Sequence, residues 1–213
     1  MTKLQAFIIP VTPFQQNCSL VFDEVRKLGA IVDPGGDVPA ILDAIGQSGI
    51  TIEKILLTHG HIDHAGGAAE LREKLGVPIE GPHPEDLFLL DNLAQSGAQY
   101  GMTDARAVTP DRWLKEGESV SVGDLSFSVH EAPGHTPGSV VFFNAENRFA
   151  LVGDVLFRGS IGRTDFPRGD HAALIRSIKE KLYPMGDDVV CLPGHGEPCR
   201  IGEERMTNPF LNE

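Results

Sequence analysis

Cysteine is scarce in this sequence. The 213 residues contain three, Cys18, Cys191 and Cys199. Three thiols do not make an even disulfide set, and no two have the C-x-x-C spacing of redox motifs. Chains of this kind are typical of reducing compartments. We therefore expect a cytoplasmic protein whose cysteines are buried or incidental, and not nucleophiles.

Basic residues are also in short supply. The chain has 18 Lys and Arg against 30 Asp and Glu, which gives a formal net charge of −12 at pH 7. Nucleic acids and anionic membranes bind basic surfaces, which displace their counterions. The charge balance therefore argues against both classes of partner. It leaves the oligomeric state open.

Long apolar runs are absent as well. No stretch approaches the roughly 18 to 20 apolar residues that cross a bilayer. Near the start, Lys3 precedes an apolar stretch that Pro10 and Pro13 interrupt, which is not typical of a signal peptide. No low-complexity tract or Pro/Ser-rich linker divides the chain, so we expect a single domain over residues 1–213.

What the sequence does contain is an alternation of short strand-like and helix-like segments. Apolar, β-branched segments bounded by turn residues predict strands over 6–11, 19–22, 30–32, 54–58, 125–129, 140–143, 149–152 and 189–192. Helical spacing predicts helices over 38–45, 65–75, 84–100 and 171–182. Asp37 and Asp170 stand where N-caps are expected. The pattern indicates an α/β protein with helices packed outside sheet.

One segment, residues 58–67, carries most of the chemical information. Three imidazoles and a carboxylate fall within six positions, at His59, His61, Asp63 and His64. On a helix, His59 and His61 would diverge by about 200°, whereas an extended segment turns both to one side. The pair can therefore hold one ion from a loop. The adjacent Asp63 and His64 can reach a neighbouring position.

Further candidate ligands follow other predicted strands. His135 and His195 lie in two similar Pro-Gly-His turns, and Asp154 ends a strand at Val-Gly-Asp. With the first cluster they make seven ligands, enough for two divalent ions that share a carboxylate. Imidazole and carboxylate suit Zn²⁺ best, although Fe and Mn accept similar sets. Asp33 also ends a strand, where it is either a turn residue or a brace for a ligand loop.

Competing catalytic motifs are absent. The sequence has no G-x-S-x-G elbow, no G-x-x-x-x-G-K-[ST] loop and no H-E-x-x-H helix. Residues 159–163 contain glycines but not the G-x-G-x-x-G spacing of a dinucleotide site. Metal chemistry therefore has no obvious rival.

The ligand pattern resembles that of the metallo-β-lactamase superfamily. His59-x-His61-x-Asp63-His64 is followed in order by His135, Asp154 and His195. The resemblance covers nearly the whole chain. It implies an αβ/βα sandwich of two mixed sheets flanked by helices, with a dinuclear site at one edge. It also implies that His59, His61 and His135 hold one metal, that Asp63, His64 and His195 hold the other, and that Asp154 bridges both.

A closer resemblance is to the short, single-domain hydroxyacylglutathione hydrolases, the type II glyoxalase II branch. It is carried by the strings at 10–19, 109–114, 162–171 and 204–210. It implies a zinc-dependent thioester hydrolase of methylglyoxal detoxification, which converts S-lactoylglutathione to lactate and glutathione. A hydroxide shared by the two metals would attack the thioester, with Asp63 as the catalytic residue that orients it.

The sequence departs from the long-form enzymes of this family at its C-terminal side. Those enzymes carry a helical domain that contributes to glutathione binding, whereas eighteen residues follow His195 here. The peptide arm of the substrate must be held in another way. Arg163 lies near the position of a basic residue in the long form and is our candidate substrate contact. The segment 84–113 could form a helical lid or a plain surface helix.

Two other activities remain open at this point. A persulfide dioxygenase shares the fold and uses one Fe(II), for which His61, His135 and Asp154 offer a three-residue set. A metallohydrolase of another ester, lactone or lactam is the second, because one fold hosts many chemistries. A purely structural zinc protein is disfavoured, since such sites are commonly closed and rich in Cys.

Overall fold

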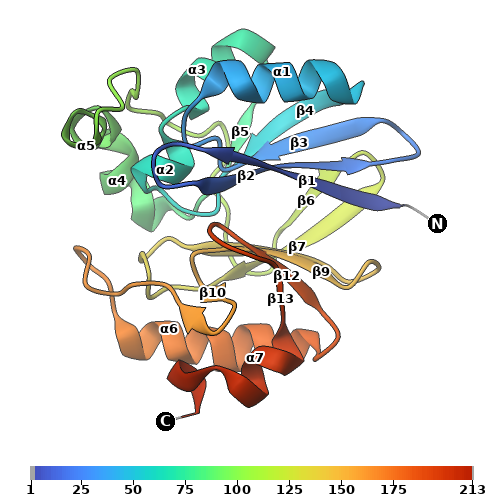
Figure 1. The fold of residues 1–213 in the computed structure, drawn as a ribbon, viewed down its shortest axis with the longest axis vertical. Coiled ribbons are helices and arrows are strands. Elements are labelled where there is room, and N and C mark those ends of the chain that lie inside the picture. Colours follow the sequence, from blue (N-terminus) through green and yellow to red (C-terminus); the bar gives the residue numbers. More distant parts are fainter. Residues whose placement is uncertain (1–2, 213) are drawn as a thin grey trace.

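Two facing β-sheets form the centre of the molecule (Figure 1). The computed structural model describes residues 3–212. In spatial order, the first sheet contains β1 (Leu4–Val11), β2 (Gln16–Asp23), β3 (Leu28–Val32), β4 (Thr51–Leu56) and β5 (Ile79–Glu80). The second contains β13 (Cys199–Arg200), β12 (Val190–Pro193), β9 (Phe149–Gly153), β8 (Val140–Asn144), β7 (Leu125–Glu131) and β6 (Ser119–Val122). A separate hairpin pairs β10 (Leu156–Phe157) with β11 (Ser160–Ile161).

Helices cover the outer faces of both sheets. In Figure 1, α1 (Val38–Ser48) and α3 (Ala68–Leu75) lie outside the first sheet, and α6 (His171–Ser177) and α7 (Ile201–Thr207) lie outside the second. Both sheets are mixed, because β3, β4 and β5 run parallel, as do β9 and β12, while the other pairs are antiparallel. The predicted αβ/βα sandwich is confirmed.

The apolar core follows these layers. Val32, Leu56, Phe127 and Phe142 belong to a buried cluster contributed by strands of both sheets. Two further clusters join each sheet to its own helices. Burying a large apolar side chain fully contributes about 1.5–3 kcal/mol, so the layers are stabilised mainly by these contacts. All eight residues of β2 are buried, which explains why that strand does not alternate between apolar and exposed positions.

The predicted helices are more broken than the sequence indicated. The helix expected over 65–75 is two helices, α2 (Ile62–Ala65) and α3, which are separated at Gly66 and Gly67. The helix expected over 84–100 is a 3-10 turn, η1 (Pro84–Asp86), followed by α4 (Leu87–Asp91) and α5 (Leu93–Tyr100). At the second break, Asn92 donates a side-chain hydrogen bond to Phe88 O (2.7 Å), which competes with regular helix geometry.

The C-terminal helices are also irregular. After α6 the chain continues as the π-helical η2 (Ile178–Leu182) and the 3-10 turn η3 (Tyr183–Met185), and η4 (Pro209–Leu211) follows α7. The two-residue strands β5, β10, β11 and β13 were not predicted, because they are too short to show a pattern. Asp170 accepts from Ala173 N (2.9 Å) as the predicted N-cap of α6. Asp37 occupies the predicted N-cap position of α1, but its side chain makes no cap bond and accepts from Thr12 N instead (2.7 Å).

Two expectations from composition can be compared with the structure. Cys18, Cys191 and Cys199 are all buried and free. Among residues 3–212, the structure has no helix of the length and hydrophobicity that a bilayer crossing requires.

Candidate metal centre

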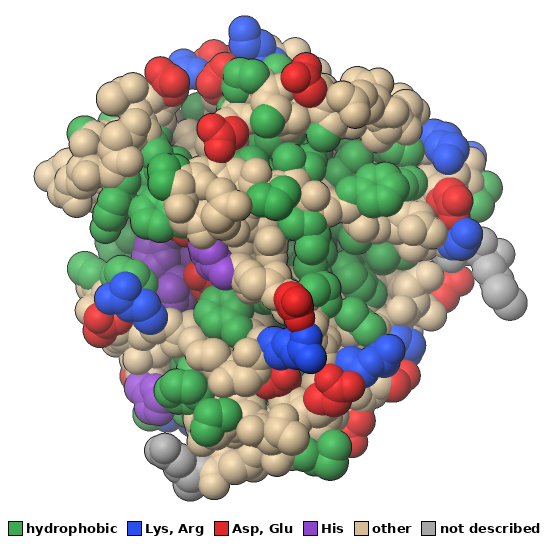
Figure 2. Space-filling model, in the orientation of Figure 1, with side chains coloured by type: hydrophobic (Ala, Val, Ile, Leu, Met, Phe, Trp, Pro, Cys, Tyr) green, Lys and Arg blue, Asp and Glu red, His purple; other side chains and the backbone are tan. Residues whose placement is uncertain are grey.

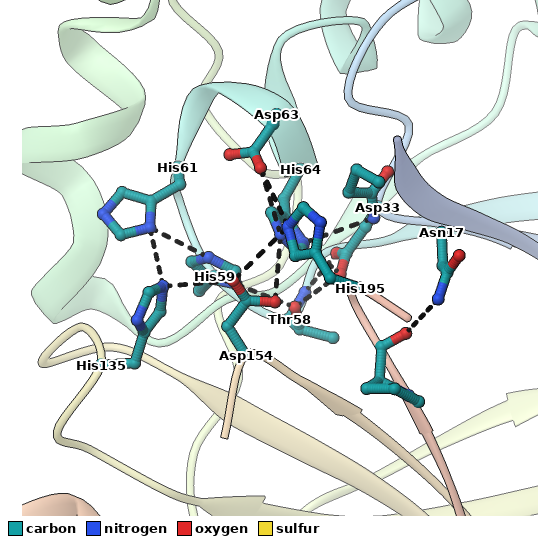
Figure 3. A network of polar contacts seen from close by, with 12 residues as sticks. Asn17, Asp33, Thr58, His59, His61, Asp63, His64, His135, Asp154 and His195 are labelled. Carbon is teal, nitrogen blue, oxygen red and sulfur yellow. Dashed lines mark hydrogen bonds and ion pairs between the residues drawn. The ribbon is translucent and has the colours of Figure 1, made fainter. Parts of the chain in front are cut away.

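The seven predicted ligands converge at one edge of the sandwich (Figure 3). They come from the segment after β4, which includes α2, and from the loops after β7, β9 and β12. His59, His64, His135 and Asp154 are buried, whereas His61, Asp63 and His195 are partly exposed. The cluster therefore has a buried floor and a side open to solvent.

Three histidines form one group. His61 Nδ1 lies 3.1 Å from His59 Nε2 and 2.9 Å from His135 Nε2. His135 Nδ1 donates to Arg163 O (2.7 Å), which leaves the Nε2 lone pair of the neutral ring directed into the group. Burial, reinforced by the neighbouring imidazoles, lowers the pKa of His59 far below its usual value and that of His61 to about 3. The group consists of neutral imidazoles, the form that binds metals.

Asp63, His64 and His195 form a second group. His195 Nε2 lies 3.1 Å from Asp63 Oδ2, and His64 Nε2 lies 3.9 Å from the same oxygen. Within each group the ligand atoms lie within 4.8 Å of one another, which is close enough for a single ion.

Asp154 lies between the two groups (Figure 3). Its Oδ2 is 3.6 Å from His135 Nε2 in the first group and 3.6 Å from His195 Nε2 in the second. Its Oδ1 is 3.3 Å from His64 Nε2. One carboxylate thus faces imidazoles of both groups.

The carboxylates and imidazoles of the second group and Asp154 shift one another's pKa values. Burial opposes ionisation of Asp63 and Asp154, but His64 outweighs it and holds the pKa of both carboxyls below its usual range. Burial likewise opposes charge on His64 and His195, but Asp154 and Asp63 raise the pKa of both imidazoles. These are the sites at which a divalent cation competes with protons.

The residues fit a divalent ion. His64 Nε2 and Asp154 Oδ1 are buried and make no hydrogen bond to the residues that the structure describes. Buried polar atoms rarely lack a hydrogen-bond partner, and a bound ion would supply one for each of these two atoms. The donors are imidazole nitrogens and carboxylate oxygens, which Zn²⁺, Fe and Mn all accept. The arrangement therefore suggests divalent metal ions without fixing their identity.

Asp33 braces this cluster from behind. Its Oδ1 accepts from Thr58 N (2.7 Å), and its Oδ2 accepts from Thr58 Oγ1 (2.6 Å) and His64 Nδ1 (2.9 Å). Both oxygens are therefore occupied, although Asp33, His59 and His64 are close enough to form a third potential metal group. The bond to His64 Nδ1 directs Nε2 of that ring toward Asp63 and Asp154.

Sequence reasoning missed Asn17, which holds the loop of His195. Asn17 Nδ2 donates to Pro193 O (3.1 Å) and Gly196 O (2.8 Å). The available signal was the polar run Gln15-Gln16-Asn17, whose last two residues begin the fully buried strand β2. Between these two carbonyls, Gly194 passes so close to Asp154 that a Cβ atom would collide with Oδ1.

The candidate substrate contact, Arg163, lies on the open side. Its guanidinium stacks on the Phe166 ring at 4.5 Å and pairs with Asp165 (2.7 Å) in an exposed ion pair. The Phe166 ring packs edge-on against His61, with centroids 4.9 Å apart. Figure 2 shows histidine side chains in a hollow of the surface, bordered by hydrophobic side chains. Arg163 is therefore connected to the cluster through one aromatic ring.

Comparison with known proteins identifies the family. The family model described as "Metallo-beta-lactamase superfamily" matches residues 11–195, a segment that contains all seven ligands. The chain belongs to the metallo-β-lactamase superfamily. Its sequence is 46% identical over 206 residues to a Haemophilus influenzae protein named hydroxyacylglutathione hydrolase GloC, and the match covers 96% of this chain and 97% of that one.

Solved structures agree on the fold. The structure titled BLEG-1 B3 metallo-beta-lactamase is 35% identical, has a TM-score of 0.91 and is matched over 98% of this chain and 100% of that one. The structure of TTHA1623 in a di-iron-bound form is 36% identical and has a TM-score of 0.86. The match covers 96% of this chain and 100% of that one. The chain is a metallohydrolase of this superfamily. The names of these three proteins refer to different substrates and, in one case, to bound iron.

Proposed function

We propose that this protein is a dinuclear, zinc-dependent hydrolase of glutathione thioesters that converts S-lactoylglutathione to lactate and glutathione. His59, His61 and His135 would hold one ion, Asp63, His64 and His195 the other, and Asp154 would contact both. The observation that carries the dinuclear part is the position of Asp154, whose Oδ2 is 3.6 Å from an imidazole of each group. The relative named hydroxyacylglutathione hydrolase supports the choice of substrate.

The chemistry of thioester hydrolysis fits these residues. When bound, divalent ions lower the pKa of water and polarise a carbonyl oxygen. Asp63 is ionised and partly exposed, so it can accept a hydrogen bond from the attacking water and orient it. The leaving group is a thiolate whose conjugate acid has a pKa of about 8.5, so it departs without obligatory protonation. No covalent enzyme intermediate is needed.

The direct test is metal loading combined with a substrate panel. The chain is purified, stripped with a chelator, reloaded with Zn²⁺ and assayed on S-lactoylglutathione. We expect no hydrolysis by the stripped protein, recovery on reloading, and about two ions per chain by elemental analysis. Reloaded protein that binds two ions but leaves the thioester intact would contradict the assigned substrate.

A second candidate is lactam hydrolysis, which the likeness to BLEG-1 favours. The same panel therefore includes a β-lactam and a lactone. Faster turnover of the β-lactam than of the thioester would select this alternative.

The mononuclear dioxygenase is tested separately. The stripped protein is loaded with Fe(II) and oxygen uptake is measured with a glutathione persulfide as substrate. This activity needs only His61, His135 and Asp154.

Arg163 is our proposed contact for the anionic peptide arm of the substrate. The chain has a formal net charge of −12, so it repels an anionic substrate at long range. A cation at the open side of the site would offset this repulsion. The ion pair with Asp165 does not prevent this role, because both side chains are about two-thirds exposed and such pairs are weak.

Replacing Arg163 by Gln is expected to raise KM for S-lactoylglutathione about tenfold with little change in kcat. A charged hydrogen bond contributes roughly 1.5–3 kcal/mol, and this one would not involve the reacting atoms. Steady-state kinetics measures both constants. Arg26→Gln is the matched control, because Arg26 is also exposed and paired with an aspartate (2.7 Å) but follows the far end of β2. An unchanged KM would remove Arg163 from the substrate site.

A further inference from the structure

A buried carboxylate outside the seven ligands lies behind the three-histidine group. Asp86, the last residue of η1, is fully buried. Its Oδ2 accepts from Gly60 N (2.8 Å) and Thr136 Oγ1 (2.8 Å), and its Oδ1 accepts from Gly138 N (2.7 Å). Both carboxylate oxygens thus accept hydrogen bonds from residues of other segments.

These three donors belong to the two loops that carry the group. Gly60 lies between His59 and His61, and Thr136 directly follows His135. A single carboxylate therefore joins the loop after β4, in the first sheet, to the loop after β7, in the second. His61 Nδ1 and His135 Nε2, which are 2.9 Å apart, are held by loops that meet at Asp86.

The fit around Asp86 is close. A Cβ atom on Gly138 would lie 2.6 Å from Asp86 Cγ, so only glycine permits this approach. His83 N also donates to Gly138 O (3.1 Å), which adds a second bond between η1 and the same loop. Arg168 also pairs with Glu85 and lies over the Phe88 ring at 4.9 Å. The segment that carries Asp86 therefore contacts two other parts of the chain.

The charge of Asp86 is consistent with these contacts. Burial raises the pKa of its carboxyl to about 6, although the bonds from Thr136, Gly60 and Gly138 oppose the increase. At neutral pH the side chain is mainly an anion, and an ionised carboxylate only accepts hydrogen bonds. Two N–H groups and one hydroxyl supply the donors it needs.

We propose that Asp86 is a positioning residue that fixes the spacing of His59, His61 and His135 and thereby raises the metal affinity of this group. Its carboxylate bonds Gly60, Thr136 and Gly138, none of which is a proposed ligand. The inference rests on the metal-binding part of the proposed function and is independent of the thioester. We expect the effect to be larger for this group, because Asp86 bonds both of its loops, whereas Asp33 bonds His64 and Asn17 holds the loop of His195.

The test is calorimetric titration of stripped protein with Zn²⁺, using Asp86→Asn. The amide keeps the size of the side chain but presents an NH₂ group to one of the three donors. His135→Ala and His195→Ala assign the two binding steps to their groups. We expect Asp86→Asn to weaken the three-histidine step by about 10- to 100-fold, the usual effect of losing a partner behind the ligands. The other step should change less than about threefold.

Asp23→Asn is the matched control for stability. Asp23 is also fully buried and accepts three backbone bonds, from Val25 N (2.9 Å), Arg26 N (3.2 Å) and Asp124 N (3.0 Å). It joins the two sheets at the far end of β2 and touches no candidate ligand. We expect this variant to lower the melting temperature of the stripped protein while leaving both metal steps unchanged. Thr136→Val, which removes one bond to Asp86, should weaken the same step by a smaller factor and serves if Asp86→Asn does not fold.

The role of Asp86 would be overturned if Asp86→Asn left the Zn²⁺ affinity of both binding steps unchanged, or weakened both equally. Weakening of the three-histidine step by Asp23→Asn would do the same, since it would show that lost stability alone suffices. A wild-type titration with a single step would instead reject the dinuclear centre.

Discussion

Asp154→Asn is expected to reduce kcat/KM for S-lactoylglutathione by about a thousandfold and to lower the metal content of the purified protein. The carboxylate faces both groups, at 3.6 Å from His135 Nε2 and 3.6 Å from His195 Nε2. In the proposed centre, its loss would remove a negative charge from between two cations, whose Lewis acidity is worth several kcal/mol, or about three powers of ten in rate. Steady-state kinetics and elemental analysis measure the two effects.

Asp188→Asn is the control for this variant, because Asp188 is largely exposed and pairs with Arg148 away from the ligands. It should leave both quantities unchanged. An Asp154→Asn protein that retained two ions and full activity would show that this carboxylate is not shared, and the dinuclear proposal would fail.

Asp63→Asn is expected to lower kcat by about 10²- to 10⁴-fold even when Zn²⁺ is saturating. The carboxylate is ionised because His64 and the hydrogen bond from His195 outweigh the effect of burial on its pKa. Asparagine keeps an oxygen for coordination but carries no charge, so it accepts a weaker hydrogen bond from the attacking water. Groups positioned on a reacting proton contribute factors of this size. Rates measured across a Zn²⁺ series separate the loss of orientation from the loss of metal.

The outcome for Asp63→Asn that contradicts a catalytic role is also clear. If added Zn²⁺ restores wild-type kcat, Asp63 acts only as a ligand. A lower kcat with nearly unchanged KM is the expected pattern, because the proposed contact for the peptide arm of the substrate is Arg163 and not Asp63. The melting temperature of the stripped variant reports whether the substitution perturbs the fold.

The sequence was informative about the ligands because they follow strands. His59, Asp154 and His195 follow β4, β9 and β12, which are apolar enough to recognise from their composition. Parallel neighbours such as β9 and β12 end at the same edge of a sheet, so ligands that follow them lie close together. The αβ/βα architecture was inferred from the resemblance, and the alternation of elements alone gave only an α/β class.

The supporting residues could not be predicted in the same way. Asp86, Asn17 and Thr58 act through contacts with loops that are distant in the sequence, and each looks like an ordinary turn or strand residue when read locally. Asp33 is a similar case. Its place after a strand can be read from the sequence, but its hydrogen bond to His64 Nδ1 depends on how the chain folds and cannot. Helix breaks at Gly66–Gly67 and Asn92 depend on local backbone geometry, which helical spacing does not report.

The ligands are divided between the two halves of the chain. His59, His61, Asp63 and His64 come from the segment that follows the first sheet's β4, whereas His135, Asp154 and His195 come from the second sheet. Neither half offers all the donors of either proposed ion site, and His195 is synthesised 136 residues after His59. On the proposed assignment, a growing chain on the ribosome lacks the last ligand of the first site until His135 emerges and docks, and that of the second site until His195 does. We therefore expect metal uptake to be a late event in the life of the polypeptide.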